Sequence, residues 1–219
     1  MSSSLIQLIV LAGIAIFLVL RLRNVLGTRD GFEKPTTPAI EKKVATRRDF
    51  EVIEGGPDRD IIDHVPDGSA SAKALMAMKS VEPDFGVGDF LQGASGAYEM
   101  ILMAFERGDL DQLTPFLAAD VLETFENVVL QRREDGLTIE ASFVGVAELV
   151  LQEATFDNAT NEAEITVKFV GELTFAVKDS SGEVIEGDQS SIKRQRDVWT
   201  FGRTMGSADP NWMLVATGG

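Results

Sequence analysis

An uncharged apolar run near the N-terminus constrains the fold of this chain most strongly. Residues 5–20 read LIQLIVLAGIAIFLVL and contain no charged side chain. With its flanking residues the run supplies roughly 18 helical residues, about 27 Å of helix, which is close to the hydrocarbon thickness of a bilayer. The preceding MSSS lacks the positive charge of a signal peptide, and Arg21 follows the run where a cleavage site would need small residues. We therefore expect residues 1–23 to form an uncleaved transmembrane anchor.

The charges after the run predict the orientation of the anchor. Residues 21–50 contain eight basic and four acidic side chains, a local balance of +4, although the whole chain has 20 basic and 35 acidic residues and a net charge of −15. Positively charged flanks tend to stay on the cytoplasmic side of a membrane. Arg21, Arg23 and Arg29 therefore predict a single-pass protein whose C-terminal part faces the cytoplasm. The same three side chains are candidates for contact with anionic lipid headgroups.

The composition excludes several functional classes. The chain has no Cys and a single His, at position 64, so disulfides, thiolate zinc sites and a cysteine nucleophile are excluded and imidazole chemistry is nearly so. Its acidic balance argues against a nucleic-acid surface, because binding to phosphates depends on Lys and Arg. The carboxylates are scattered without the spacing of a metal site. We expect no cofactor, no metal and no nucleic-acid partner.

Residues 24–87 have the composition of a linker. They are rich in Pro, Gly, Thr and charged residues, and their apolar residues follow no fixed period. Such a segment buries too little apolar surface to offset its conformational entropy. We expect a flexible tether with one short helix at residues 70–79, and we expect His64 to be solvated within it.

Apolar residues then recur at helical spacing, first between Asp89, a candidate N-cap, and Gly108, a candidate helix end. Residues 109–117 predict a short helix, and residues 119–133 predict a longer amphipathic helix that covers a sheet. Small residues in the first helix would let another backbone pack close to it. These small residues are Gly93, Ala94, Gly96 and Ala97.

After Gly136 the period of the apolar residues changes to two, which indicates strands. Residues 137–156 and 163–179 predict a hairpin, with a bend at Gly145 and a turn at residues 157–161. A second turn precedes two further strands at residues 191–201 and 211–217. Helices followed by a curved antiparallel sheet define an α+β domain over residues 88–219, and a cone of this kind leaves an apolar pocket between its two layers.

Eight residues are candidates to line that pocket, although plain core packing is the alternative for each of them. Trp199 and Trp212 flank one polar turn, so we expect them to meet as cross-strand or diagonal neighbours. The others face inward by strand alternation or lie on the first helix. The full set is Tyr98, Phe105, Phe143, Ile165, Val167, Phe169, Trp199 and Trp212.

Several segments, in order along most of the chain, resemble the Tim44-like family, named for the membrane-anchor subunit of the mitochondrial protein-import motor. They are RLRNVLGTRDG, FLQGASGAYEMILMAFERGDLDQLTPFLAADVLETF, FVGVAE, ITVKFVGE and DVWTFGR followed by DPNWMLVAT. The anchor-plus-tether layout is similar to the alpha-proteobacterial members. The resemblance implies a cone-shaped, nuclear transport factor two-like domain with a hydrophobic pocket, which acts as a scaffold in the bacterial inner membrane. The chaperone-recruiting region of the mitochondrial member has no counterpart in residues 24–87.

The function expected from these features is that of a non-enzymatic, membrane-tethered adaptor. It would hold protein partners at the cytoplasmic face of the inner membrane, in protein translocation or in the assembly of a membrane complex. One alternative is a pocket that binds a lipid or a small apolar ligand. Another is a pocket enzyme of the isomerase or dehydratase type, which needs an ionisable group facing the pocket. Tyr98 lies among apolar positions, and strand alternation leaves open whether Asp197 points inward or outward.

Overall fold

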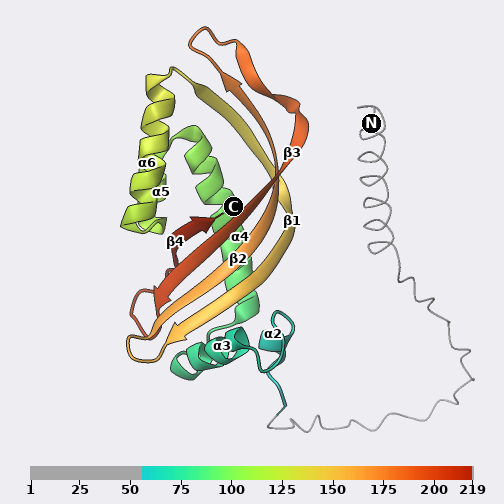
Figure 1. Ribbon diagram of the computed structural model, residues 1–219, viewed down its shortest axis with the longest axis vertical. Coiled ribbons are helices and arrows are strands. Elements are labelled where there is room, and N and C mark those ends of the chain that lie inside the picture. The colour runs from blue at the N-terminus through green and yellow to red at the C-terminus, as the bar shows by residue number, and fades with distance from the viewer. Residues whose placement is uncertain (1–55, 219) are drawn as a thin grey trace, which may run out of the picture. The chain divides into compact units, whose positions relative to one another are not determined.

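The structure is a computed structural model, and it describes residues 56–218. The expected anchor at residues 1–23, with Arg21, Arg23 and Arg29, lies outside these residues, as does the tether up to residue 55. Within residues 56–218, no helix is both long enough and apolar enough to cross a membrane. Figure 1 shows helices packed on one side of a long, curved antiparallel sheet, which confirms the α+β class.

The sheet is a meander of four antiparallel strands in chain order. Its longest edge strand is irregular: the pairing with its neighbour shifts at three places, one of them beside Gly145, where the sequence predicted a bend. Each shift inserts an unpaired residue and increases the local twist, which curves the sheet around the helices (Figure 1). The strands are β1 (Thr138–Asp157), β2 (Glu162–Lys178), β3 (Val184–Thr204) and β4 (Met213–Gly218).

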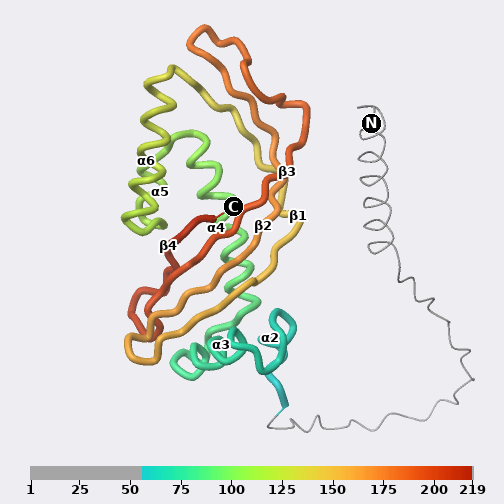
Figure 2. Tube along the Cα trace, viewed as in Figure 1, coloured from blue at the N-terminus to red at the C-terminus, as the bar shows by residue number. Residues whose placement is uncertain are grey.

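The predicted helices are present with nearly the predicted bounds. The longest, α4 (Val87–Arg107), ends at Gly108, whose φ of 67° favours a residue without a side chain. Its buried face, with Tyr98, Ile101 and Leu102, packs on the sheet. The chain then turns through two short elements into the amphipathic helix, as the trace in Figure 2 shows. These elements are α5 (Leu110–Leu113), η1 (Thr114–Phe116) and α6 (Ala119–Glu134).

The ordered domain begins earlier than predicted. Residues 59–87, which we assigned to the tether, form α2 (Arg59–Ile62) and α3 (Ala70–Val81), and the connection from α3 to α4. We call residues 58–86 the arm. The arm has apolar residues in the core that are at most 9% exposed, and α3 covers the edge of β1. The short helix predicted at residues 70–79 is present as α3. The sequence did not indicate that the arm packs in the core, because Pro and Gly separate its few buried apolar residues. They are Ile61, Val65, Ala72, Leu75, Met78 and Phe85.

The arm also caps the first long helix. Gly86, the N-cap of α4, has no side chain, and Asp89, the expected cap, lies inside the first turn instead. Asp60 of α2 supplies the missing acceptor: its two carboxylate oxygens accept hydrogen bonds from the backbone N–H groups of Val87 at 2.7 Å and Gly88 at 2.9 Å. A carboxylate at this position satisfies free N–H groups and complements the helix dipole.

Lys79 of α3 holds the same carboxylate in place. Its Nζ lies 2.7 Å from Asp60 Oδ2 and donates a 2.7 Å hydrogen bond to Asp58 Oδ2. Burial by itself would raise the pKa of Asp60, but the hydrogen bonds from Lys79, Gly88 and Val87 and the positive charge of Lys79 outweigh it. The pKa of Asp60 is therefore lowered, and the ionised form is the one that stabilises the fold.

We expect Asp60→Asn to lower the free energy of unfolding by about 1 kcal/mol at pH 7, the usual worth of a helix cap. Since the folded pKa is lowered, this contribution is present above the unfolded value of about 3.9 and is lost as the pH falls through the folded value. Urea denaturation of the full chain between pH 3 and pH 7 measures the difference. Asp63→Asn, at an exposed position nearby, is the control. A difference between Asp60→Asn and wild type that stayed constant over this range would contradict the assignment.

Candidate functional site

Five of the eight candidate pocket residues lie in the closed core and face no cavity. Ile165 and Val167 are fully buried in β2, and the ring of Tyr98 stacks on that of Phe169, with centroids 4.4 Å apart and planes 4° apart. Trp199 packs 4.8 Å from Tyr98. For these five residues, facing inward means contact with other side chains, as in a well-packed protein interior.

A hydrogen bond between α4 and β3 crosses this core. The hydroxyl of Tyr98 donates to Asp197 Oδ2 at 2.6 Å, so the carboxylate of Asp197 points inward. Gln195 donates a second bond to Asp197 Oδ1 at 3.2 Å. Gly171 leaves room for the phenol, because a Cβ atom there would lie 2.6 Å from its oxygen.

The hydrogen bond between Tyr98 and Asp197 joins α4 to β3. Burial raises the pKa of Tyr98 far above its ordinary value, and the hydrogen bond and negative charge of Asp197 raise it further. The phenol therefore stays protonated and donates. Neither side chain lines one of the main cavities of residues 56–218; Tyr98 is fully buried, whereas Asp197 is half-buried.

The two tryptophans do not meet, which corrects the prediction. Trp199 lies opposite Thr217 in the pairing of β3 with β4, whereas Trp212 precedes β4 and packs 4.8 Å from Phe90. Phe201 lies between the surroundings of the two tryptophans. Its ring centroid is 6.3 Å from that of Trp199 and 6.0 Å from that of Phe90, the neighbour of Trp212. A loop of eight residues between the paired strands displaces Trp212 from the position that alternation implies.

The remaining two candidates lie elsewhere. Phe143 is partly buried and packs 6.1 Å from Tyr98. Phe105 packs 4.6 Å from Phe125 of α6, and the guanidinium of Arg132 lies 4.4 Å above its ring. Trp212 is therefore the member of the candidate set that lines the largest cavity of the described residues.

That cavity is a groove of about 470 Å³. Its walls come from five parts of the chain: the end of the arm, the first half of α4, η1, the end of β3 and the β3–β4 loop. Aromatic rings supply most of its apolar surface, and single rings come from the arm, from η1 and from the loop. The five rings are Phe85, Phe90, Phe116, Phe201 and Trp212.

Small residues of α4 form the floor of the groove. Gly93, Ala94 and Ala97 line it, and a Cβ atom added at Gly93 would meet nothing within 4 Å. The groove is open because the helix has no large side chains here. The sequence indicates the small residues as a place for close backbone approach, and of the five rings it named Trp212 alone as a candidate for a pocket.

The rim of the groove is acidic. Glu82, Asp84 and Asp89 line it together with one cation, Arg203. Arg203 is already paired, since its Nη2 donates to Glu82 Oε1 at 2.7 Å and its side chain is 10% exposed. Asp84 and Asp89 therefore leave the rim with a net negative charge beside an apolar floor.

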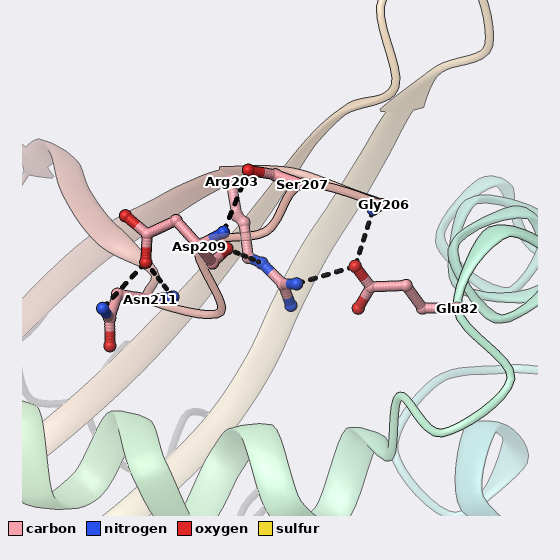
Figure 3. A network of polar contacts seen from close by, with 6 residues as sticks. All are labelled: Glu82, Arg203, Gly206, Ser207, Asp209 and Asn211. Atoms are coloured by element: carbon pink, nitrogen blue, oxygen red, sulfur yellow. Dashed lines mark hydrogen bonds and ion pairs between the residues drawn. The ribbon is translucent and has the colours of Figure 1, made fainter.

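A polar network fixes the loop that carries Trp212 (Figure 3). Glu82 Oε1 accepts a second bond from the backbone N–H of Gly206 at 2.6 Å, and Arg203 Nε donates to the carbonyl of Asp209 at 3.2 Å. Asp209 then accepts from the backbone and side chain of Asn211, at 3.0 and 2.8 Å. The loop is thus held at both of its ends before the chain reaches Trp212.

A smaller cleft of about 290 Å³ lies at the other end of α4 and contains the carboxylate of Glu106. Burial raises the pKa of Glu106, although Arg132 and Lys193 act in the opposite direction. Arg132 Nη1 is 3.5 Å from Glu106 Oε2, a loose ion pair. Among residues 56–218, no group of three or more His, Asp or Glu side chains is placed to hold a metal ion.

The fold and the groove define a small α+β domain with an apolar groove and an acidic rim. The chain belongs to the Tim44-like domain family, whose sequence profile matches residues 71–219. A relative in Arabidopsis thaliana, mitochondrial import inner membrane translocase subunit TIM44-1, is 22% identical over 173 residues, which cover 75% of this chain and 36% of the relative. The chain therefore spans about a third of that relative's length.

The profile confirms the family resemblance found in the sequence, and it begins inside α3, so it includes part of the arm. Among solved structures, the intermembrane space region of the chloroplast protein ARC6 aligns over 57% of this chain and 94% of that chain, with 10% identity and a TM-score of 0.36. So low a score carries no argument. The nuclear transport factor two-like cone stays a prediction.

The different environments of the two tryptophans predict different costs of truncation. We expect Trp199→Ala to lower the free energy of unfolding by about 3–5 kcal/mol, as for other buried aromatic residues. Trp212→Ala should cost about 1–2 kcal/mol, because its ring is only partly buried. Chemical denaturation followed by far-UV circular dichroism measures both. Equal losses would mean that Trp212 is a core residue and that the groove is closed.

Proposed function

We propose that this protein is a non-enzymatic scaffold, tethered to the bacterial inner membrane by residues 1–23, that holds a partner protein at the cytoplasmic face. Membership of the Tim44-like family and a relative named as an import translocase subunit support a role in protein translocation or in membrane-complex assembly. The uncharged run and its basic flank support the anchor and its orientation.

The groove is the observation that carries the proposal. It offers two partly exposed aromatic rings, Phe116 and Trp212, backed by three buried rings and beside small residues of α4; aromatic side chains are enriched in protein interfaces. Asp84 and Asp89 on the rim favour a cationic partner, and aromatic rings also attract cations. We therefore commit to one occupant: an apolar segment of a partner protein that carries basic residues at its flank.

The lining of the groove supports binding rather than catalysis. It contains no His, Ser, Lys or Tyr, and its carboxylates lie on the rim. An isomerase or dehydratase would need an acid or base facing its substrate, and Glu106 in the smaller cleft is the residue that comes nearest to this requirement. Its raised pKa is explained by burial. The positive charges of Arg132 and Lys193 compensate the negative charge of Glu106. This arrangement favours an ion cluster over a catalytic acid or base.

Two glycines of α4 provide a matched test of the groove. Gly93 lines it and Gly96 does not, yet both are exposed and an added Cβ meets nothing within 4 Å at either position. We expect the full chain in nanodiscs to bind a fluorescent apolar peptide with basic flanks. Gly93→Trp should weaken this binding at least tenfold, or about 1.4 kcal/mol, and Gly96→Trp by less than twofold, as measured by fluorescence anisotropy.

Charge and ligand class give two further comparisons in the same assay. A peptide with acidic flanks should bind much more weakly, and Asp84→Asn with Asp89→Asn should reduce both the affinity and its dependence on salt. If Gly93→Trp and Gly96→Trp behave alike, the groove is not the binding site. If a neutral lipid displaces the peptide and binds more tightly, the groove is a lipid site and the scaffold proposal is wrong.

The anchor has its own test in bacterial cells. We expect the full chain with a C-terminal tag to stay in the membrane after carbonate extraction, and its tag to be digested by protease in inverted vesicles but not in spheroplasts. Deletion of residues 1–23 should release the protein. Replacement of Arg21, Arg23 and Arg29 by Glu should reduce correct insertion. A soluble mature protein without its first residues, or a tag digested in spheroplasts, would exclude cytoplasmic tethering.

A further inference from the structure

The arm forms one wall of the proposed binding groove. Its last residues, from Glu82 to Gly86, line the groove directly, and the ring of Phe85 lies 6.0 Å from that of Trp212 on the opposite wall. The chain before Arg59 enters the arm with no other element of the domain between them. Any partner or force that acts on the N-terminal part of the chain therefore acts on this wall first.

Polar contacts at both ends of the arm attach it to the rest of the domain. At the N-terminal end, Asp60 caps α4 through the N–H groups of Val87 and Gly88. At the other end, one oxygen of Glu82 accepts from both Arg203 and Gly206. Figure 3 shows this carboxylate bonded to both groups. The segment that lines the groove is thus held between two carboxylates.

The hydrogen bonds of Glu82 also connect the arm to the β3–β4 loop. Arg203, which it holds, also donates to Asp209 in the loop that leads to Trp212. Without Glu82, the guanidinium would lose its acidic partner and the N–H of Gly206 would lose its acceptor. The same hydrogen bonds therefore hold the arm and the β3–β4 loop. Displacement of the arm would remove the bonds that hold the loop.

The helices of the arm are too short to persist alone. The longer one, α3, has 12 residues, and α2 has four; isolated helices of this length are marginal in water. Docking on the edge of β1 and folding of the arm must therefore occur together. Local opening of a unit of this kind requires less free energy than global unfolding.

We propose that the arm is a strap that forms the groove when it is docked and removes it when it is released, with Glu82 as the positioning residue that joins the strap to the loop of Trp212. This inference rests on the proposed function of the groove, whose regulation it describes. A partner in the groove contacts both the strap and the loop, so partner binding and docking of the strap strengthen each other by the same factor. Pulling on the chain before Arg59 then lowers the affinity for the partner.

Hydrogen exchange on the full chain in nanodiscs tests the strap without any ligand. In Glu82→Ala, we expect the amides of α3 and of the β3–β4 loop to exchange about tenfold faster together, since two hydrogen bonds to a charged group are lost. The amides of β1 and β2 should keep their rates. Glu82→Gln retains an acceptor and should show a smaller effect in the same two segments. Glu148→Ala, which removes the ion pair with Lys168 outside the groove, should change neither segment.

Three outcomes would overturn the strap. Faster exchange in the loop alone would show that the arm is independent of Glu82. Uniformly faster exchange in all elements, for Glu82→Gln as well, would show global destabilisation. Unchanged affinity for the basic-flanked peptide in Glu82→Ala, despite a released arm, would separate the strap from the groove. If instead exchange changes as expected but wild type binds no peptide, the proposed function fails while the coupling of arm and loop stands.

Discussion

The packing of Tyr98 on the sheet fixes the position of α4, and most of the domain depends on it. Its ring stacks on Phe169, its hydroxyl bonds to Asp197, and Gly171 provides the space for both contacts. This residue is fully buried and fully satisfied, so the helix can neither rotate nor slide without leaving a buried polar group unpaired. The face of α4 that carries Tyr98 is therefore packed in the core. The small residues of α4 that line the groove lie beside this face, and Ala94, one turn before Tyr98, belongs to both.

The sequence predicted the elements whose apolar pattern is set by one contiguous core. Helical spacing identified α4 and α6, and alternation identified the strands, because these elements bury one face where they pack on the core. The first half of β3, residues 184–194, is exposed and shows no such pattern. The arm is instead held by contacts between residues far apart in the sequence. Its cap on α4 joins residues 27 positions apart, and its bond to the β3–β4 loop joins Glu82 to Arg203, 121 positions away. No local pattern encodes contacts of this kind.

The candidate site was predicted less well than the fold, for a related reason. Alternation identifies which side chains face inward, but residues such as Phe169 and Trp199 meet other rings there and leave no space between them. The groove forms instead where the layers end, between the arm and a loop. Gly93, Ala94 and Ala97 were the visible signal, since a helix face without large side chains leaves room beside it. Of the rings that complete the groove, Trp212 was a predicted pocket residue, whereas Phe85 comes from the arm, whose packing local patterns did not show.

A tethered scaffold can work with a groove of modest affinity. In the proposed arrangement, anchor and partner share one membrane surface, and confinement raises the effective concentration of each for the other without any new contact. Weak binding then suffices for occupancy, and it also permits release. A strap at the point where the chain enters the domain suits this regime, because a coupling of a few kcal/mol is enough to change the occupancy of a weak site. The occupancy of a closed pocket with tight binding would not change with a coupling of this size. The open, acidic-rimmed groove and the arm that forms its wall are therefore consistent with a site that exchanges its partners.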